Sequence, residues 1–208
     1  MTAPTSTLRA VVLGCSLRSS STDSESSSEL LGRQILDALA DHDVDGEVLR
    51  AADLGIKFGV STDEGGGDGW PAVRDKILAA QILVLAVPIW MGQPASIAKV
   101  VLERLDAELA ETDDQGRPTM YGKVAVCAVV GNEDGAHHVT AEVFQALNDV
   151  GFTIPAAGGT YWVGEAMGSV DYKDAGPKPE TTGKAAKTLA ANAAHLARLL
   201  QASPYPAS

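Results

Sequence analysis

Three apolar runs rich in valine and leucine constrain the fold of this chain more than any other feature. They lie at Leu8–Gly14, at residues 81–87 and at residues 123–130, and read LRAVVLG, QILVLAV and KVAVCAVV. Each run is apolar at nearly every position rather than at alternate ones, which is typical of a strand buried on both faces. Such strands occur in parallel sheets that are covered by helices. The three runs therefore predict an α/β fold.

Amphipathic segments separate the apolar runs. Apolar residues recur at three-to-four-residue spacing, the period of a helix with one buried face, in residues 30–40, 94–109, 139–150 and 183–202. A short helix is expected after Pro71, and weaker strand patterns occupy residues 46–51 and 152–155. Strand and helix thus alternate five times. We predict a doubly wound, five-stranded parallel sheet with helices on both faces, forming a single domain over residues 1–208.

Proline and glycine positions refine the expected helices and loops. Pro94 is expected in the first turn of its helix, where its missing N–H removes no hydrogen bond, and Leu109 lies on the predicted buried face of that helix. Gly151 stands where a glycine cap would end the next helix. The acidic, glycine-rich residues 53–69 predict a mobile surface loop. Residues 166–182 show no regular pattern.

The composition argues against several classes of protein. Of the 208 residues, 45% are hydrophobic and 21% are charged, within the ordinary globular range. The 27 acidic and 16 basic side chains give a net charge of −11, which opposes non-specific binding to nucleic acid. No apolar run is long enough to span a bilayer, and residues 1–9 lack the apolar stretch of a secretory signal. We therefore expect a cytoplasmic protein without a membrane span.

The two cysteines, Cys15 and Cys127, form neither a C-x-x-C pair nor a cluster with histidines at ligand spacing. We expect both to be buried thiols, and we predict no metal site.

In a doubly wound sheet, ligands bind beyond the carboxyl ends of the strands. The loop after the first strand, residues 15–28, is rich in serine and leads into a helix, so hydroxyl groups and free helix N–H groups could surround an anion. The chain lacks a G-x-G-x-x-G fingerprint after this strand and a P-loop. Hydroxyl groups without a P-loop lysine suit a terminal phosphomonoester. The alternative is a solvated loop with a capping box from Ser26 to Glu29.

Two further loops follow strong strands. Residues 88–96, PIWMGQPAS, predict a stiff turn with exposed backbone amides, and Trp90 offers a flat surface for an aromatic ring or simply packs against the protein. Residues 131–138, GNEDGAHH, contain two glycines that allow the backbone to approach a ligand. The adjacent histidines point apart on a helix and favour surface positions at its N-terminus over a metal site, although His137 could contact a ligand.

Three segments together resemble the flavodoxin-like superfamily, in particular its NAD(P)H-dependent FMN reductases. The segments are residues 8–39, residues 87–105 with the sequence VPIWMGQPASIAKVVLERL, and residues 129–155 with the sequence VVGNEDGAHHVTAEVFQALNDVGFTIP. The resemblance implies that the loop after the first strand holds the phosphate of FMN. It also implies that the loops after the third and fourth strands hold the isoalloxazine ring.

The resemblance assigns individual residues to these roles. The residues that match the phosphate loop are Ser16, Arg18, Ser26, Ser27 and Ser28. The residues that match the two ring-binding loops are Pro88, Ile89, Trp90, Met91 and Gly92, and Gly131, Asn132, Glu133, Asp134 and Gly135. The backbone amides from Trp90 to Gly92 are expected to donate near N5 and the carbonyl edge of the ring. The candidates for the substrate pocket are His137, Tyr161 and Trp162, the last two of which are taken to follow the last strand and either flank the ring or pack in the protein.

The sequence departs from the family pattern in three places. The first loop is longer and carries Asp23 and Glu25, which would repel a phosphate unless they point outward. Trp90 stands where the family often has tyrosine. Residues 132–134 replace a small, glycine-rich sequence, which bears on the substrate pocket more than on the flavin.

The implied activity is transfer of electrons from NADH or NADPH through FMN to a small acceptor such as a quinone or free flavin. The flavin would carry the chemistry, so no catalytic side chain is expected and the kinetics should be ping-pong. Two alternatives remain: a flavodoxin-type electron carrier that docks through an acidic face, and a flavodoxin-like binding protein without cofactor. The resemblance also implies a homodimer, with residues 94–109 as a plausible contact surface.

The acidic residues are unevenly distributed along the chain. The acidic residues expected at the end opposite the flavin loops are Asp41, Asp43, Asp45, Glu47, Asp106, Glu108, Glu111, Asp113 and Asp114. Residues 173–198 contain five basic and two acidic side chains. A phosphate would therefore be held by local amides, hydroxyl groups and Arg18 against an unfavourable long-range field.

Overall fold

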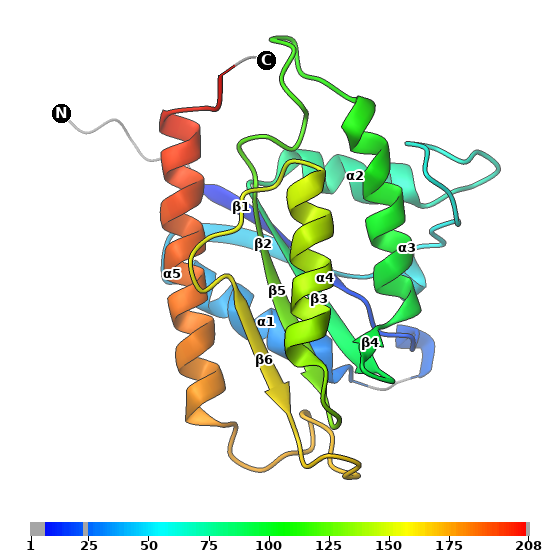
Figure 1. Cartoon of the computed structure of the whole chain (residues 1–208), viewed down its shortest axis with the longest axis vertical. Helices are drawn as coiled ribbons and strands as arrows, with labels where there is room; N and C mark the ends of the chain where they lie inside the picture. The colour runs from blue at the N-terminus through cyan, green and yellow to red at the C-terminus, as the bar shows by residue number, and fades with distance from the viewer. Residues whose placement is uncertain (1–6, 23–24, 207–208) are drawn as a thin grey trace.

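The computed structural model describes residues 7–22 and 25–206. Its central sheet has the strand order β2-β1-β3-β5-β6, and neighbouring strands on this path are parallel (Figure 1). The strands are β1 (Leu8–Gly14), β2 (Val44–Arg50), β3 (Ile82–Trp90), β5 (Val124–Gly131) and β6 (Gly159–Val163), with the two-residue β4 (Gln93–Pro94) antiparallel to β3. The predicted α/β doubly wound sheet of five parallel strands is confirmed.

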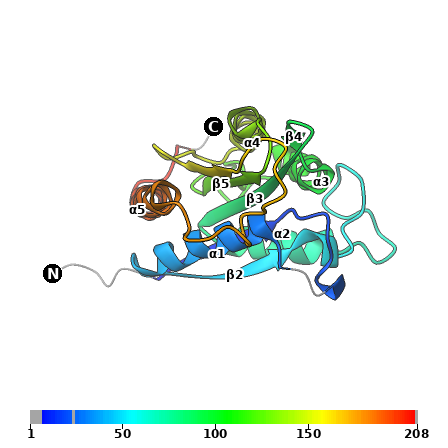
Figure 2. The ribbon, with the colours of Figure 1, turned by 90° about the horizontal axis from the view of Figure 1, so that it is seen from below.

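Helices cover both faces of the sheet, as Figure 2 shows from the carboxyl ends of the strands. The helices are α1 (Ser27–Ala40), α2 (Trp70–Ala79), α3 (Ser96–Leu105), α4 (Ala136–Asp149) and α5 (Glu180–Ala202), with short 3-10 turns η1 (Ser20–Thr22), η2 (Ala51–Asp53) and η3 (Asp106–Ala110). One buried cluster joins α1 and α5 to the sheet through Val12, and the other joins α2, α3 and α4 through Leu13. Successive β1 side chains thus pack into cores on opposite faces of the sheet, which explains why the strand is apolar except at the exposed Arg9.

The last strand begins later than the sequence pattern predicts. Residues 152–155 contribute only an isolated bridge between Thr153 and Val124, and the fifth parallel strand is β6. Phe152 is 1% exposed and packs into the core, which accounts for its apolar signal. Pro155 has no N–H for a ladder, and its carbonyl accepts a hydrogen bond from Gly158 that closes a turn. The strand prediction for 152–155 is therefore wrong.

Both ends of α3 also differ from the prediction. Pro94 lies in β4 and pairs with Ile89, so the helix begins at Ser96 instead of near Pro94. After Leu105 the backbone tightens to the 3-10 turn η3, which has three residues per turn and rotates Leu109 away from the core. Leu109 is 58% exposed, so its predicted burial is wrong.

The predicted glycine cap of α4 is confirmed. Gly151 directly follows Val150, the C-cap residue of α4, and adopts a φ of +108°. Its N–H donates to Asn148, and the next N–H, of Phe152, donates to Leu147. These bonds satisfy carbonyl groups that the helix end would otherwise leave free.

Cys15 and Cys127 are both buried free thiols, as predicted. Burial raises the pKa of both thiols, with Cys127 reaching about 12, so both are protonated at neutral pH. Within residues 7–22 and 25–206, no helix has the length and apolar character to cross a membrane.

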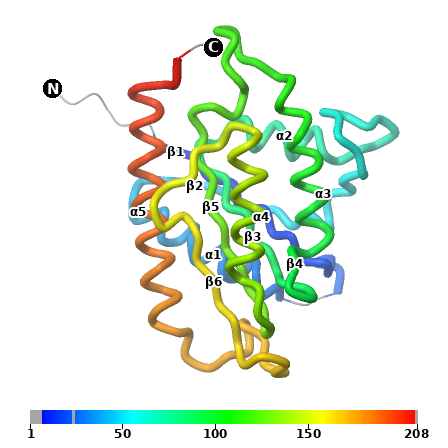
Figure 3. Tube along the Cα trace, viewed as in Figure 1, coloured from blue at the N-terminus to red at the C-terminus, as the bar shows by residue number. Residues whose placement is uncertain are grey.

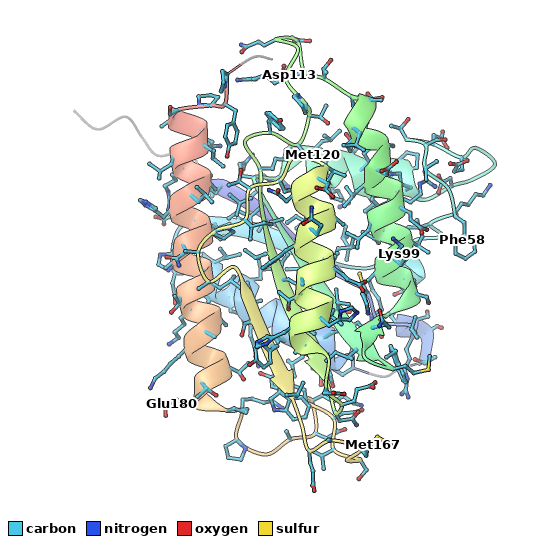
Figure 4. The ribbon with its side chains drawn as sticks, in the orientation of Figure 1. Phe58, Lys99, Asp113, Met120, Met167 and Glu180 are labelled. Carbon is cyan, nitrogen blue, oxygen red and sulfur yellow. The ribbon has the colours of Figure 1, made fainter. Side chains whose placement is uncertain are left out.

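The acidic segments largely lie at the end opposite the carboxyl ends of the strands. Figure 4 shows Asp113 at one end of the molecule and Met167, which follows β6, at the other. Glu108 is an exception within the acidic segments, because it is fully buried and bonded to Arg74 and Thr119. Glu108 is therefore part of the protein interior and does not contribute to a solvated acidic surface.

The loop between η2 and α2 is anchored by one buried arginine, Arg104 of α3. The guanidinium lies 2.7 Å from a carboxylate oxygen of Asp68, and both side chains are 0% exposed. It also donates to the carbonyl oxygens of Lys57 and Ser61 and lies over the ring of Trp70. The loop has exposed tips, as predicted for a surface loop. These contacts tie its backbone to α3, so it is more firmly anchored than the predicted mobile loop.

The Asp68 carboxylate is correspondingly stabilised in its charged form. Burial alone would raise the pKa of Asp68, but three backbone N–H donors, of Glu64, Lys57 and Trp70, together with Arg104 hold that pKa well below its usual range. Neutralising either partner of the pair would leave the other charge buried without compensation.

We predict that Arg104→Met lowers the free energy of unfolding by about 3–5 kcal/mol, because Asp68 would be left as an uncompensated buried charge. Urea denaturation followed by circular dichroism measures this effect. Lys99→Met on the same helix is the control and should change stability by less than about 0.5 kcal/mol, since Lys99 is exposed and contacts Glu103 only at 4.0 Å. An Arg104→Met protein as stable as the wild type would contradict the assigned role.

Candidate functional site

A pocket of about 290 Å³ lies at the carboxyl ends of β1, β3 and β5. The chain leaves β1 toward β2 on one side and leaves β3 toward β5 on the other, so the strand order reverses between β1 and β3. This is the switch point at which open α/β sheets bind their ligands. The walls come from the loops after the three strands and from the segment after β6.

Most of the residues predicted for the site line this pocket. They are Ser16, Arg18, Ser26, Ser27, Ser28, Pro88, Ile89, Trp90, Gly131, Asn132, Glu133 and Trp162. The predicted residues that lie outside the pocket lining are Met91, Gly92, Asp134, Gly135, His137 and Tyr161. The three loops singled out from the sequence therefore converge, although parts of the second and third loops lie outside the pocket lining. Asp23 lies outside the described residues.

Serine hydroxyl groups surround the start of α1. Ser26 is the N-cap, and its Oγ accepts a hydrogen bond from the N–H of Glu29 at 3.3 Å. The Oγ atoms of Ser26 and Ser28 lie 3.1 Å apart, and the Oγ of Ser16 accepts from the N–H of Arg18 at 3.2 Å. Helix geometry leaves the first-turn amides without intrahelical partners. These hydroxyl and amide groups suit an anion with several acceptor oxygens.

Glu29 completes only half of the predicted capping box. Its carboxylate lies 2.6 Å from Arg33 of α1 and 2.7 Å from Arg50 at the end of β2. Burial alone would raise the pKa of Glu29, but the hydrogen bonds from Arg50 and Arg33 outweigh this and lower it. The buried carboxylate therefore joins the start of α1 to the edge strand and positions the serines above it.

The second loop is a tight hairpin between β3 and β4. Met91 and Gly92 connect Trp90 to Gln93 with φ angles of +53° and +73°, which is the geometry of a type I′ turn. Only glycine adopts such angles freely, so Met91 is held in a left-handed conformation that costs on the order of 1 kcal/mol. Trp90 precedes the turn, is 50% exposed and lines the pocket.

Glu133 occupies the amides of this turn. Its two carboxylate oxygens accept hydrogen bonds from the N–H groups of Met91 at 2.9 Å and Gly92 at 3.1 Å. The sequence interpretation assigned these amides to the edge of a flavin ring, but they are already bonded within the protein. We therefore correct that interpretation: Glu133 is a clamp between the second and third loops, and the two amides are not free donors.

Two other contacts lock the third loop in place. The side-chain N–H of Asn132 donates to the carbonyl of Gly168 at 2.8 Å, and the carbonyl of Asn132 accepts from Met167 at 3.0 Å. Gly135 has a φ of +114°, and a Cβ at this position would lie 2.9 Å from the Cα of Gly92. Glycine is therefore needed here for close backbone contact with the hairpin rather than with a ligand.

Tyr161 and Trp162 lie within β6 and not after it, so the predicted location is corrected. Alternate residues of a strand face opposite sides of the sheet. Trp162 lines the pocket, and the centre of its ring lies 5.3 Å from the centre of the Tyr172 ring. Tyr161 lies outside the lining and contacts His137 edge to face at 5.2 Å. His137 and His138 are exposed in the first turn of α4, as predicted.

The sequence analysis assigned no binding role to part of the pocket wall, which includes Glu25, the acidic residue expected to repel a phosphate unless it points outward. The additional lining residues are Leu17, Glu25, Val130, Asp171, Tyr172 and Lys173. The last three belong to the segment that showed no regular pattern. This segment has neither a hydrophobic period nor a turn motif that would predict its position. Its position depends on where β6 ends and on contacts with α1.

We predict that Glu133→Ala accelerates amide hydrogen exchange at Met91 and Gly92 by about tenfold or more, because both N–H groups lose a charged acceptor. Exchange measured by NMR on the protein without added ligand tests the clamp directly. Asp134→Ala is the matched control, since Asp134 is exposed, and should leave both rates unchanged. Unaltered exchange in Glu133→Ala would show that the carboxylate does not hold the turn.

The chain has clear relatives among known proteins. The chain is 39% identical over 139 residues to the 8-demethyl-8-aminoriboflavin-5'-phosphate synthase of Streptomyces davaonensis, covering 66% of this chain and 54% of that protein. It is 36% identical over 171 residues to a protein of Mycobacterium bovis described as divalent metal cation transporter MntH, covering 79% of this chain and 25% of that protein. The chain thus spans about half and about a quarter of these two relatives.

Solved structures show the same fold. The crystal structure of RosB with bound 8-demethyl-8-formylriboflavin-5'-phosphate has a TM-score of 0.85 and 33% identity, and the match covers 95% of this chain and 82% of that chain. A flavodoxin from the domain Archaea has a TM-score of 0.59 at 10% identity, with 92% and 99% covered, and shows the fold alone.

The family model described as NADPH-dependent FMN reductase matches residues 8–168, which span β1 to β6 and the three loops of the pocket. The chain belongs to this NADPH-dependent FMN reductase family.

Proposed function

We propose that this chain binds FMN in the pocket at the carboxyl ends of β1, β3 and β5 and uses it to oxidise NADH or NADPH. The electrons would pass to a small acceptor such as a quinone or free flavin. The observation that carries the proposal is that one pocket is lined both by serine hydroxyl groups at the start of α1, the hydroxyl-rich end, and by the aromatic side chains of Trp90 and Trp162. Membership of the FMN reductase family supports it.

The hydroxyl-rich end fits the phosphate of FMN. Ser16, Ser26 and Ser28 are each less than 10% exposed, so their hydroxyl groups are directed by the fold rather than freely solvated. Ser27, next to them, also lines the pocket, and each hydroxyl can donate one hydrogen bond. Arg18 adds a positive charge at the same wall. These groups would hold the phosphate oxygens.

The apolar and aromatic lining fits the isoalloxazine ring. Ile89 and Val130, each 4% exposed, line the pocket together with Trp90 and Trp162. An aromatic ring gains from offset or edge contact with tryptophan. Because Glu133 occupies the amides of the hairpin, the ring would be oriented mainly by these apolar contacts, and the clamp would keep Trp90 in position.

FMN, when bound, supplies the redox chemistry by accepting a hydride equivalent and passing electrons onward. The residues of the chain would bind and orient it and leave one face open for the nicotinamide. We assign no catalytic side chain, and we place the acceptor at the same open face. Ping-pong kinetics are the consequence.

The RosB likeness favours a second candidate function. That structure holds a flavin 5'-phosphate derivative described as an intermediate, at 33% identity to this chain. A flavin 5'-phosphate is therefore a candidate substrate as well as a candidate cofactor here. Mass spectrometry of FMN recovered after incubation with the protein distinguishes the two, since a cofactor is recovered unchanged and a substrate is not.

We also propose, from the family resemblance, a cytoplasmic homodimer with α3 at the contact surface. All described helices pack on one sheet, which supports a single domain. Size-exclusion chromatography with light scattering tests the dimer.

We predict that the purified protein binds FMN in a one-to-one ratio with a flavin absorption spectrum, and that it consumes NADH or NADPH steadily when given a quinone or free flavin. The experiment combines a spectral titration with steady-state kinetics. FMN binding without turnover of small acceptors would favour the electron carrier instead. Failure to bind FMN at all would contradict the proposed function.

We predict that Trp90→Ala raises the Kd for FMN about tenfold, because a large aromatic contact is lost. Flavin fluorescence titration measures the Kd. The affinity for riboflavin should fall by the same factor, since Trp90 would contact the ring and not the phosphate. Trp90→Phe is the control and should recover most of the affinity. Equal affinity of Trp90→Ala and the wild type for FMN would show that the flavin ring does not contact the hairpin.

A further inference from the structure

A segment beyond the family match forms one wall of the pocket. The family model ends at residue 168, whereas Asp171, Tyr172 and Lys173 line the pocket. We call residues 171–178 the strap. Figure 3 shows the chain leaving β6, crossing the carboxyl ends of the strands and entering α5. Figure 2 shows this segment passing beside the start of α1.

Several contacts fix the strap to the fold. The Tyr172 side chain is 1% exposed, and its hydroxyl donates to Gln34 of α1 at 2.7 Å. The ammonium group of Lys178 lies 4.8 Å from the centre of the Tyr172 ring. It also donates to the carbonyl oxygens of Tyr172, Lys173 and Ala175. The strap is therefore a built wall with a defined backbone.

Lys173 lies beside the serine hydroxyl groups. Its backbone N–H donates to the Oγ of Ser27 at 3.2 Å, which places Lys173 against the first turn of α1. Its side chain is 23% exposed, and its ammonium group lies 3.9 Å from a carboxylate oxygen of Asp174, beyond hydrogen-bond distance. Lys173 thus lines the pocket with only a loose ion pair to the exposed Asp174, and that pair leaves its ammonium hydrogens unbonded to Asp174.

The balance of charge around the pocket makes this cation important. The lining carries two cationic side chains, Arg18 and Lys173, against three acidic ones, Glu25, Asp171 and Glu133. The whole chain carries a net charge of −11. A phosphomonoester carries about −1.5 to −2 charges at neutral pH. Arg18 is exposed and Lys173 is mostly buried, so the Lys173 charge is screened less by water.

We infer that Lys173 binds the 5'-phosphate of the flavin, and that the strap thereby makes the pocket select phosphorylated flavin over riboflavin. The inference rests on the proposed binding of FMN and adds a residue from outside the family match. The fold brings Lys173 to the phosphate end by the bond between the strap backbone and Ser27. A lysine ammonium and a phosphate oxygen form a charge-assisted hydrogen bond, which is stronger than the bonds from neutral serines.

The test compares FMN and riboflavin as ligands of the 208-residue chain. Fluorescence titration gives the Kd of each for the wild type, Lys173→Met, Lys173→Arg and the control Lys187→Met. Lys187 lies on α5 outside this pocket, and its substitution changes the net charge by the same amount. We expect Lys173→Met to raise the Kd for FMN about tenfold and to leave riboflavin within about twofold. Lys173→Arg should restore FMN binding, and Lys187→Met should resemble the wild type.

The outcomes separate this inference from the proposed function. If the wild type binds neither flavin, the proposed function fails. If the wild type binds FMN and Lys173→Met binds it equally well, the inference alone is overturned. Equal weakening of FMN and riboflavin would overturn it too, because it would indicate a structural role only. A changed preference between NADPH and NADH at an unchanged Kd for FMN would indicate that Lys173 contacts the nicotinamide nucleotide instead of FMN. This result would contradict the inference.

Discussion

Burial of the central strands on both faces is the constraint on which the rest of this structure depends. Neighbouring residues of β1, such as Val12 and Leu13, enter opposite cores, so helices must cover both sides of the sheet. Parallel strands bury their backbone polar groups in the ladder, and every connection must return along the outside. As a result, the loops that follow β1, β3 and β5 all meet at one edge, where polar and aromatic groups form the pocket.

The pocket is shaped by side chains that bind to backbone rather than to a ligand. Glu133 holds the hairpin amides, Asn132 holds the segment after β6, and Lys178 holds the strap. The contacts of Glu133 and Asn132 join loops that are far apart in the sequence, whereas those of Lys178 lie within the strap. Such internal ties preorganise the pocket, which would lower the entropic cost of binding the proposed ligand. The left-handed backbone of Met91 is tolerated because Glu133 accepts from its N–H.

The charge distribution follows from the same arrangement. Segments after the helices lie at the end of the molecule opposite the pocket, and they carry much of the acidic charge without facing the ligand. Glu108 is an exception among them, since it is buried and paired with Arg74. Glu29, at the start of α1 beside the pocket, is likewise buried and paired with arginines. Under the proposed function, the phosphate would be held by hydroxyl groups, helix amides and nearby cations, whose effect would be strong because they are close and partly shielded from water.

The sequence by itself determined the fold class, four of the five parallel strands (the weak pattern at 46–51 corresponds to β2) and the three loops of the pocket, because apolar runs and helical periods are local signals of burial. It also indicated the Ser26 cap and the glycine at Gly151. Only the tertiary structure decided that β6 replaces the predicted strand at 152–155, that Glu133 is a clamp, and that Lys173 reaches the pocket. Phe152 shows why: an apolar residue signals burial, but whether it is buried in a strand or beneath a helix end depends on contacts with residues far away in the chain. Hydrogen bonds between loops carry no period at all, so their partners are defined only once the sheet has brought the loops together.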